Sequence, residues 1–442
     1  MLTQTQPPAA GLWAPIAPPD LASRMRAAVA DLALEIPTLG EPGMETRLAK
    51  ARYPEERQSG ELARGAAGRE LFHWYASREE PVGADEVRGS RGVEGLRWHM
   101  ANEALPPGLF LGISGLMWTC CHVERQAGES NWAEYQDFDA ALATAVREWQ
   151  SAQVDAISGL CGVGVYLLER LPEPAAAAAL CDLVDRLDSL AIRTRQGTWW
   201  ATPPEWIPED SRADYPEGWC DLGVAHGVGG IVGLLAQIVE AIPACDAARR
   251  LLVEAAEFLL ATSRQYGGGA DLPKGFRLER GNLAQPTEIV SHAAWCRGSL
   301  GLACALSRAA GVTSNHEWLA AAVSMGRAHA ARLLQGEPSR GDTSLCHGLA
   351  GNAHLLNRLF QRSGDQSLRS ASLRCYERLL EARSAPGQPD SVGGFQVLLP
   401  LEDGSLHWAP SFGFLVGASG IGLSLLAGSG SIPPAWDRVL LI

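Results

Sequence analysis

The residues with the clearest chemical potential are two cysteines and two histidines at matched positions of a repeated pattern. They lie in three tripeptides, Ala225-His226-Gly227, Cys296-Arg297-Gly298 and Cys346-His347-Gly348. Two thiols and one imidazole suit Zn²⁺, and three protein ligands leave open the fourth position that is typical of a catalytic zinc site. The spacing therefore predicts a metal site at Cys296, Cys346 and His347, with simple packing of buried cysteines as the alternative.

The chemistry of such a site follows from its ligands. Two thiolates cancel the charge of Zn²⁺, so the centre is a mild Lewis acid that binds an incoming thiol, deprotonates it and leaves it nucleophilic. His226 stands at the matched level but outside the ligand set, where it is placed to act as acid or base. Asp155, four residues before the first glycine of the neighbouring repeat, is expected to orient His226 or to share that role.

These residues belong to a chain that repeats itself. The pattern Gly-x-x-Gly, followed by an apolar run, occurs seven times, starting at Gly65, Gly112, Gly159, Gly227, Gly298, Gly348 and Gly417. The shortest interval, 47 residues, suits two helices and their turns. The longer intervals predict insertions near residues 198–218, 266–291 and 387–410.

One helix of each pair is predicted to be internal and the other to face solvent. The run after each glycine pair is apolar nearly all round, whereas stretches between the runs, such as residues 174–192 and 246–263, are amphipathic. Seven such pairs form either an open solenoid or a closed ring. We expect closure, because paired glycines let inner helices start close together around an axis. The prediction is an all-α, double-layered (α/α) toroid or barrel of about seven helix pairs over residues 61–442, with residues 1–60 as an N-terminal helical extension.

Composition excludes several classes of protein. Lys and Arg number 37 against 50 Asp and Glu, and the net charge of −13 argues against a nucleic-acid binder. The ten cysteines form no regular disulfide framework, which predicts a reduced, cytoplasmic setting. The uncharged stretches at residues 222–239 and 404–436 contain glycine or proline, so we expect buried helices and no membrane span.

The motifs around these residues resemble those of a known family, the lanthionine synthetase C (LanC-like) cyclases, which include the nisin-type lanthipeptide cyclases. The resemblance runs from about Glu61 to Ile442. It is carried by Gly-Leu-Cys-Gly at 159–162, Leu-Gly-Val-Ala-His-Gly at 222–227, Trp-Cys-Arg-Gly at 295–298, Cys-His-Gly at 346–348 and Pro-Ala-Trp-Asp-Arg-Val-Leu-Leu at 434–441. It implies a double-layered helical toroid that binds zinc through two Cys and one His.

By this resemblance, individual residues take on the family's roles. Cys296, Cys346 and His347 match the zinc ligands, and His226 and Asp155 match the acid and base candidates.

The chain departs from the family beside the first ligand. His292 occupies the position where the family often has Arg, and Arg297 follows the ligand where Tyr is common. Arg297 is thus a candidate for the missing cation, and together with His292 and Trp295 it is predicted to bind substrate.

The resemblance implies a zinc-dependent cyclase that adds a peptide cysteine thiol to dehydroalanine or dehydrobutyrine in the same peptide. Its substrate would be a ribosomal precursor peptide, and its products would be the thioether rings of lanthionine and methyllanthionine. The chain is too short to include a dehydratase as well. A separate lanthipeptide dehydratase is therefore an expected partner, in a complex that could include a transporter.

The sequence is compatible with other functions as well. A zinc prenyltransferase also activates a thiol, although an Asp is normally among its ligands. A glycosidase needs paired carboxylates, for which the aligned repeat positions offer Asp155 and Glu61. A zinc protein that binds peptides or small thiols without cyclising them is a further alternative.

Two other groups of residues lie outside the predicted zinc site. Cys120-Cys121-His122 is expected to be structural, because consecutive side chains of a helix point in different directions. Four tryptophans of the longest insertion either line a peptide groove or pack a loop; they are Trp199, Trp200, Trp206 and Trp219.

Overall fold

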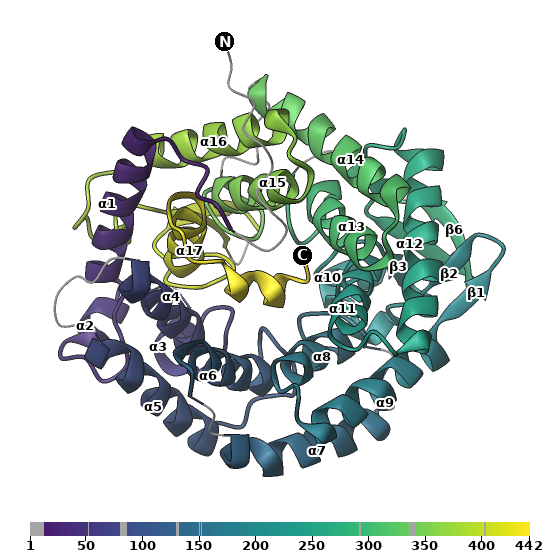
Figure 1. The fold of residues 1–442 in the computed structure, drawn as a ribbon, viewed down its shortest axis with the longest axis horizontal. Helices are drawn as coiled ribbons and strands as arrows, with labels where there is room; N and C mark the ends of the chain where they lie inside the picture. Colours follow the sequence, from purple (N-terminus) through teal and green to yellow (C-terminus); the bar gives the residue numbers. More distant parts are fainter. Residues whose placement is uncertain are drawn as a thin grey trace. The chain divides into compact units, whose positions relative to one another are not determined.

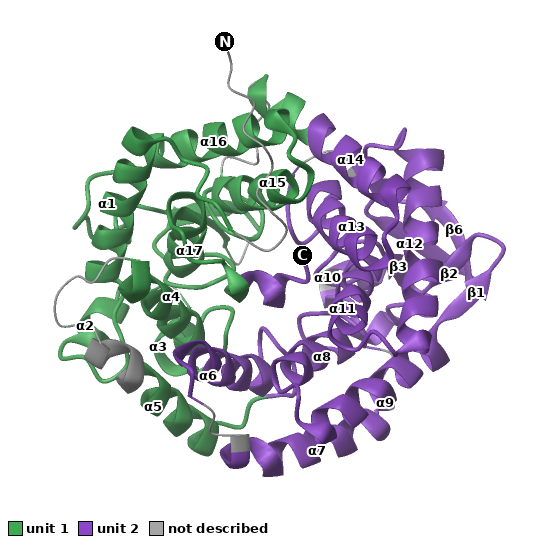
Figure 2. Cartoon of the chain, in the orientation of Figure 1, with its two compact units in different colours: residues 1–105, 329–436 green, residues 106–328, 437–442 purple. Residues whose placement is uncertain are grey.

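A computed structural model of the chain describes residues 13–442, except residues 52, 80–85, 130–131, 150, 152, 291–292, 336–341 and 402–403. Helices make up most of the described residues, and the strands are short. The chain divides into two compact units (Figure 2). Unit 1 comprises residues 1–105 and 329–436, and unit 2 comprises residues 106–328 and 437–442.

Unit 2 is built on four helices that begin at Gly-x-x-Gly turns and pack against one another in chain order (Figure 1). They are α6 (Ile113–Ala127), α8 (Leu160–Glu169), α11 (Val228–Ala241) and α13 (Ser299–Thr313). Three amphipathic helices cover one side of this row: α7 (Gln136–Arg147), which follows the 3-10 helix η1 (Trp132–Tyr135), α9 (Pro174–Leu190) and α12 (Asp246–Tyr266). Helix α14 (His316–Leu334) contains the boundary, because its residues up to Ala328 belong to unit 2 and those from His329 belong to unit 1.

Unit 1 follows the same plan. Three of its helices begin at Gly-x-x-Gly turns: α4 (Ala66–Glu79), α15 (Leu349–Ser363) and α17 (Ala418–Ser429). Each packs on an outer helix, which is α5 (Glu86–Asn102) for α4, α16 (Gln366–Glu381) for α15 and α1 (Pro19–Glu35) for α17. The short helices α2 (Met44–Leu48) and α3 (Pro54–Gln58) complete the N-terminal part.

The strands lie between the helix pairs. In unit 2, β1 (Ile192–Thr194) and β2 (Gly197–Trp199) form a hairpin, and β4 (Leu272–Pro273) pairs with β7 (Ile289–Val290). An antiparallel sheet in the order β3-β5-β6 joins β3 (Trp219–Asp221), β5 (Gly275–Glu279) and β6 (Asn282–Pro286). The remaining short elements are η2 (Pro204–Trp206), α10 (Glu209–Arg212) and η3 (Ala435–Leu440), together with β8 (Val397–Pro400) and β9 (Leu406–Ala409), which pair in unit 1.

The two kinds of helix differ in burial as the sequence predicts. In α11 every residue from Val228 to Val239 is buried, so this uncharged stretch lies in the protein core. In α12 a stripe at three- and four-residue spacing is buried, including Leu251, Ala255 and Leu259. Among the helices of the described residues, none is both long and apolar enough to cross a bilayer.

Paired glycines explain how the inner helices begin. The first glycine of the motif is the N-cap residue of α6, α8, α11, α13, α15 and α17, and Gly65 directly precedes α4. The second glycine lies against the backbone carbonyl six residues earlier: Gly230 on Val224, Gly301 on Trp295 and Gly351 on Leu345. A methyl group at these positions would overlap the carbonyl oxygen, so the turn folds back tightly only with glycine there.

Candidate functional site

The turns before the inner helices are joined by backbone hydrogen bonds. In unit 2, Phe110 N donates to Ile157 O at 3.0 Å, Ala156 N to Ala225 O at 3.0 Å, and Ala225 N to Cys296 O at 3.2 Å. Consecutive turns therefore lie side by side. The hydrogen bond between Ala156 and Ala225 holds the turns of Asp155 and His226 together, and their side chains meet although they differ in position relative to the first glycine.

Unit 1 has the equivalent series. Cys346 N donates to Leu415 O at 2.9 Å, and Phe414 N donates to Ala63 O at 2.8 Å. Cys346 takes part in this series through its N–H, whereas Cys296 takes part in the series of unit 2 through its carbonyl. Because both precede the N-terminus of a long helix, the positive end of that helix favours a thiolate at each position.

His226 and Asp155 form a close pair in unit 2. His226 Nδ1 donates to Asp155 Oδ2 at 2.8 Å, since a carboxylate only accepts. The other oxygen, Oδ1, accepts from the backbone N–H groups of Ser158 and Gly159 at 2.8 Å each, so the carboxylate cannot rotate away. Burial by itself lowers the pKa of His226, but the hydrogen bond and charge of Asp155 outweigh it and the pKa is raised.

A second ion pair lies beside the first. Asp221, the last residue of β3, is buried, and burial raises its pKa although Arg297 and His226 oppose the shift. Its Oδ1 accepts from Gly223 N at 2.7 Å, and its Oδ2 lies 3.4 Å from Arg297 Nε. Arg297 is thereby fixed by a carboxylate that the sequence analysis did not single out. The available signal was its place in the stretch Cys-Asp-Leu-Gly at 220–223, directly before the histidine turn.

Both pairs line one cavity of unit 2, with a volume of about 400 Å³. Its polar lining includes Asp155, His226, Asp221, Arg297 and Lys274. Its aromatic lining comes from the long insertion and consists of Trp206, Tyr215 and Trp219. An aromatic cavity of this size that also holds fixed charges can take a peptide segment and transfer protons to it.

The four tryptophans of the insertion lie in two different environments. Trp206, which is 46% exposed, and Trp219 line the cavity. Trp199 and Trp200 are buried, and the indole N–H of Trp200 donates to Leu187 O at 2.9 Å, so they pack the insertion onto the helices. Lys274 and Tyr215 also line the cavity and were missed, because neither belongs to the repeat pattern.

The three residues predicted to bind substrate, Arg297, Trp295 and His292, also differ in where they lie. Arg297 lines the cavity. Trp295 is 1% exposed, and its indole N–H donates to Leu440 O at 2.7 Å, which places it in the core of unit 2. His292 lies outside the described residues.

The candidate metal ligands sit on two of the glycine turns. Cys296, on the turn before α13, is half-buried. Cys346 is buried and His347 half-buried on the turn before α15. His347 Nε2 lies 3.2 Å from Oδ2 of Asp342, a buried carboxylate that also accepts from Leu398 N at 3.0 Å. A carboxylate behind an imidazole fixes its orientation, as is usual for histidines that bind metals.

The motif Cys120-Cys121-His122 lies within α6, as predicted, and all three residues are buried. The imidazole of His122 stacks on Trp118 with the ring centroids 4.4 Å apart, and its Nδ1 lies 3.4 Å from Glu169 Oε1. These contacts tie α6 to the end of α8, which is a structural role.

The sequence matches the family model described as "Lanthionine synthetase C-like protein" over residues 56–441. Among solved structures, nisin cyclase is similar, with a TM-score of 0.68 and 17% identity over 87% of this chain and 93% of that chain. A sugar epimerase from a ruminal bacterium matches with a TM-score of 0.46 and 10% identity over 93% of this chain and 100% of that chain. No curated protein matches the chain. The family match and the likeness to nisin cyclase confirm the predicted fold class, the all-α (α/α) toroid.

Proposed function

Since the chain belongs to the family of lanthionine synthetase C-like proteins, we propose that it is a zinc-dependent lanthipeptide cyclase. It adds cysteine thiols of a dehydrated precursor peptide to dehydroalanine or dehydrobutyrine and so forms lanthionine and methyllanthionine rings. The observation that carries this proposal is the fixed His226–Asp155 pair in a cavity that can take a peptide segment. The turn of His226 is hydrogen-bonded to the turn of Cys296, a candidate zinc ligand.

The proposed zinc ligands are Cys296, Cys346 and His347. Cys296 belongs to unit 2, and Cys346 and His347 belong to unit 1. We propose that together they supply the three protein ligands of one zinc ion. Each cysteine lies two residues before the first glycine of its own turn, so both have the same place in the repeat. Two thiolates and one imidazole are a donor set that zinc prefers. A bound zinc would lower the pKa of the substrate thiol and keep its sulfur nucleophilic at neutral pH.

In the proposed mechanism, the thiolate sulfur of the peptide attacks the β-carbon of the dehydro residue, and the electron pair of the double bond moves towards the adjacent carbonyl. The protonated His226 then donates a proton to the α-carbon of the resulting enolate. Asp155 holds the Nδ1–H, which leaves Nε2 as the nitrogen that gives and regains the proton. The proton lost by the thiol balances the proton gained by carbon, so the peptide keeps its mass.

Arg297 is proposed to stabilise charge in the same cavity. Asp221 orients its guanidinium through the 3.4 Å contact. A fixed cation near the developing enolate oxygen lowers the barrier because it needs no reorientation during the reaction. In this role Arg297 would replace the arginine that the family often has at the position of His292.

The proposed partners are the precursor peptide and the separate enzyme that dehydrates it, with a transporter as a further member of the complex. Because the cyclase substrate is a reduced peptide with free thiols, we propose that the protein works in the cytoplasm.

The test is an assay with a chemically dehydrated peptide that contains one cysteine and one dehydroalanine. The zinc-loaded wild type should consume the free thiol, measured by alkylation and mass spectrometry, while the mass of the unalkylated peptide stays constant. The Cys346→Ala variant should leave the thiol unreacted. A wild type that retains zinc but leaves the thiol untouched would instead favour a peptide-binding protein that does not cyclise.

A further inference from the structure

We propose that Lys274 and Arg297 form a carboxylate-binding subsite in the cavity of unit 2. The subsite holds an acidic side chain or the C-terminal carboxylate of the peptide. The proposal rests on the function proposed above in one respect: it takes the occupant of the cavity to be a peptide. It adds that this peptide carries a negative charge at a defined place.

The backbone fixes the position of Lys274. Its carbonyl accepts from Leu222 N at 3.2 Å and its N–H donates to Glu288 O at 3.0 Å, so its backbone is held on both sides directly before β5. The next residue is Gly275, where a Cβ would lie 2.8 Å from Cε3 of Trp219. Glycine therefore lets the indole ring lie across the strand, directly beside the lysine.

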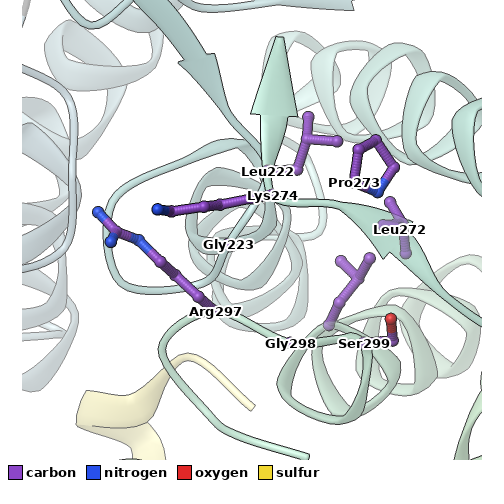
Figure 3. Close-up of a pocket in the computed structure, with 9 residues that line it drawn as sticks. Leu222, Gly223, Leu272, Pro273, Lys274, Arg297, Gly298 and Ser299 are labelled. Atoms are coloured by element: carbon purple, nitrogen blue, oxygen red, sulfur yellow. The ribbon is translucent and has the colours of Figure 1, made fainter. Parts of the chain in front are cut away.

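The indole of Trp219 brings the two cations together. Lys274 Nζ lies 5.8 Å and Arg297 Cζ lies 5.5 Å from the centroid of its ring. The negative face of an aromatic ring attracts cations, which offsets part of the repulsion between the two side chains. Figure 3 shows that the side chains of Lys274 and Arg297 extend in the same direction, although they come from different segments of the chain. Both line the cavity.

The charges of the cavity leave the lysine uncompensated. Arg297 is paired with Asp221, and His226 is paired with Asp155. Asp214, the remaining carboxylate of the lining, is exposed at the rim. Within the described residues, the ammonium group of Lys274 makes no ion pair with a carboxylate, and its partner is the indole ring.

The missing counter-charge of Lys274 favours a carboxylate as the ligand. A half-buried ammonium is stabilised by a counter-charge, and a carboxylate between Lys274 and Arg297 would accept hydrogen bonds from both cations. Because the ammonium of Lys274 has no carboxylate partner among the described residues, the cavity should favour an acidic ligand over a neutral one. Trp206 and Tyr215 would pack on the neighbouring residues of the same peptide.

Binding can be measured without turnover by the tryptophan fluorescence of the full chain. Three linear peptides that lack cysteine and dehydro residues serve as probes: one with an internal Glu and an amidated C-terminus, one with Gln and a free C-terminus, and one with Gln and an amide. The wild type should bind one of the acidic probes about tenfold more tightly than the neutral probe, the scale of one charge-assisted hydrogen bond. The probe that is favoured identifies whether a side chain or the C-terminus supplies the carboxylate.

Variants assign the preference to the lysine. Lys274→Gln keeps Arg297 and should lose most of the preference for an acidic probe, and Lys274→Glu should prefer a probe in which Lys replaces Glu. Arg195→Gln is the matched control, because it removes one exposed positive charge from the β1–β2 turn of the same unit, outside the cavity lining, and should keep the wild-type preference. Far-ultraviolet circular dichroism melts of the four proteins verify that each is folded.

Cross-linking gives an independent readout. The chain has two lysines, Lys50 and Lys274, so a carbodiimide-activated peptide carboxylate should form its amide at Lys274, located by mass spectrometry after digestion. Equal affinity of the wild type for charged and neutral probes, or a preference that Lys274→Gln retains, would overturn the subsite. Loss of cyclisation with an intact charge preference would count against the proposed function alone, because the binding assay needs no reaction.

Discussion

His226 Nδ1 and Asp155 Oδ2 lie 2.8 Å apart, although 71 residues separate them in the sequence. The contact arises because two consecutive glycine turns are hydrogen-bonded through Ala156 and Ala225. A single backbone ladder thus assembles a charged pair inside a cavity, and the pair makes the acid–base role of the histidine testable.

The first prediction concerns the histidine itself. His226→Asn removes the group that protonates the enolate but keeps a side chain of similar polarity. We expect the turnover of the dehydrated peptide to fall by about 10²–10⁴, the usual contribution of a general acid or base. Zinc content, measured by inductively coupled plasma mass spectrometry, should match the wild type. Loss of zinc in this variant would show that the histidine is a ligand.

The second prediction is a pH dependence. An acid must be protonated to act, so the step that depends on His226 slows as pH rises through the pKa of this histidine. Since Asp155 raises that pKa above its ordinary value of 6.5, the decline should be centred above pH 6.5. In Asp155→Asn the midpoint of this decline in rate should move to lower pH. Rate measurements from pH 5.5 to 9 on both proteins locate the two midpoints. An unchanged midpoint would mean that a different group is titrating.

The third prediction is the effect of the same pair on stability. A histidine whose pKa is raised in the folded state stabilises that state below the unfolded pKa of 6.5, and loses this contribution as pH rises through the folded pKa. The difference in free energy of unfolding between the wild type and Asp155→Asn should therefore be larger at pH 6 than at pH 9. Urea unfolding at the two pH values measures it. A difference that is larger at pH 9 would contradict the assigned charge state.

The fourth prediction concerns the metal. The purified wild type should contain about one zinc per chain, and Cys296→Ala and Cys346→Ala should each lose most of it, because two remaining ligands hold zinc weakly. Cys181→Ala is the control, since this exposed cysteine lies on the outer helix α9 and should leave zinc unchanged. Zinc in the variants at the level of the wild type would rule out the proposed ligand set.

The fifth prediction tests the glycine turns with two substitutions in one helix. Gly301→Ala places a methyl group on the carbonyl oxygen of Trp295 and should lower the free energy of unfolding by about 1–3 kcal/mol, the typical cost of overpacking. Gly311→Ala lies in the same helix with open space around its Cβ position. It should raise stability by up to about 1 kcal/mol through helix propensity. Thermal melts of both variants provide the comparison.

The repeat pattern was sufficient to predict the all-α fold and the positions at which the inner helices begin. Only glycine, which lacks a Cβ, fits where the chain folds back on its own carbonyl, so each glycine pair locates a turn. The apolar run that follows predicts a helix that is buried on all sides. The same alignment placed Asp155 and His226 in neighbouring turns, and the distance between them agrees with it. It also placed the three proposed zinc ligands just before helix N-termini, where their joint binding of a metal stays a prediction.

Only the tertiary structure identified Asp221, Tyr215 and Lys274 as parts of the cavity, and separated Trp206 and Trp219 from the buried Trp199 and Trp200. These residues lie in the insertions or, for Trp219 and Asp221, in the short strand that follows the longest insertion, outside the repeat pattern. Their positions depend on the antiparallel register that sets Trp219 opposite Arg277 and Asp221 opposite Gly275. Such pairing joins segments far apart in the chain, and a shift by one residue would turn each side chain to the other face of the strand. Composition and spacing do not predict that register. The burial of an inner helix, by contrast, is predicted by the apolar run in each copy of the repeat.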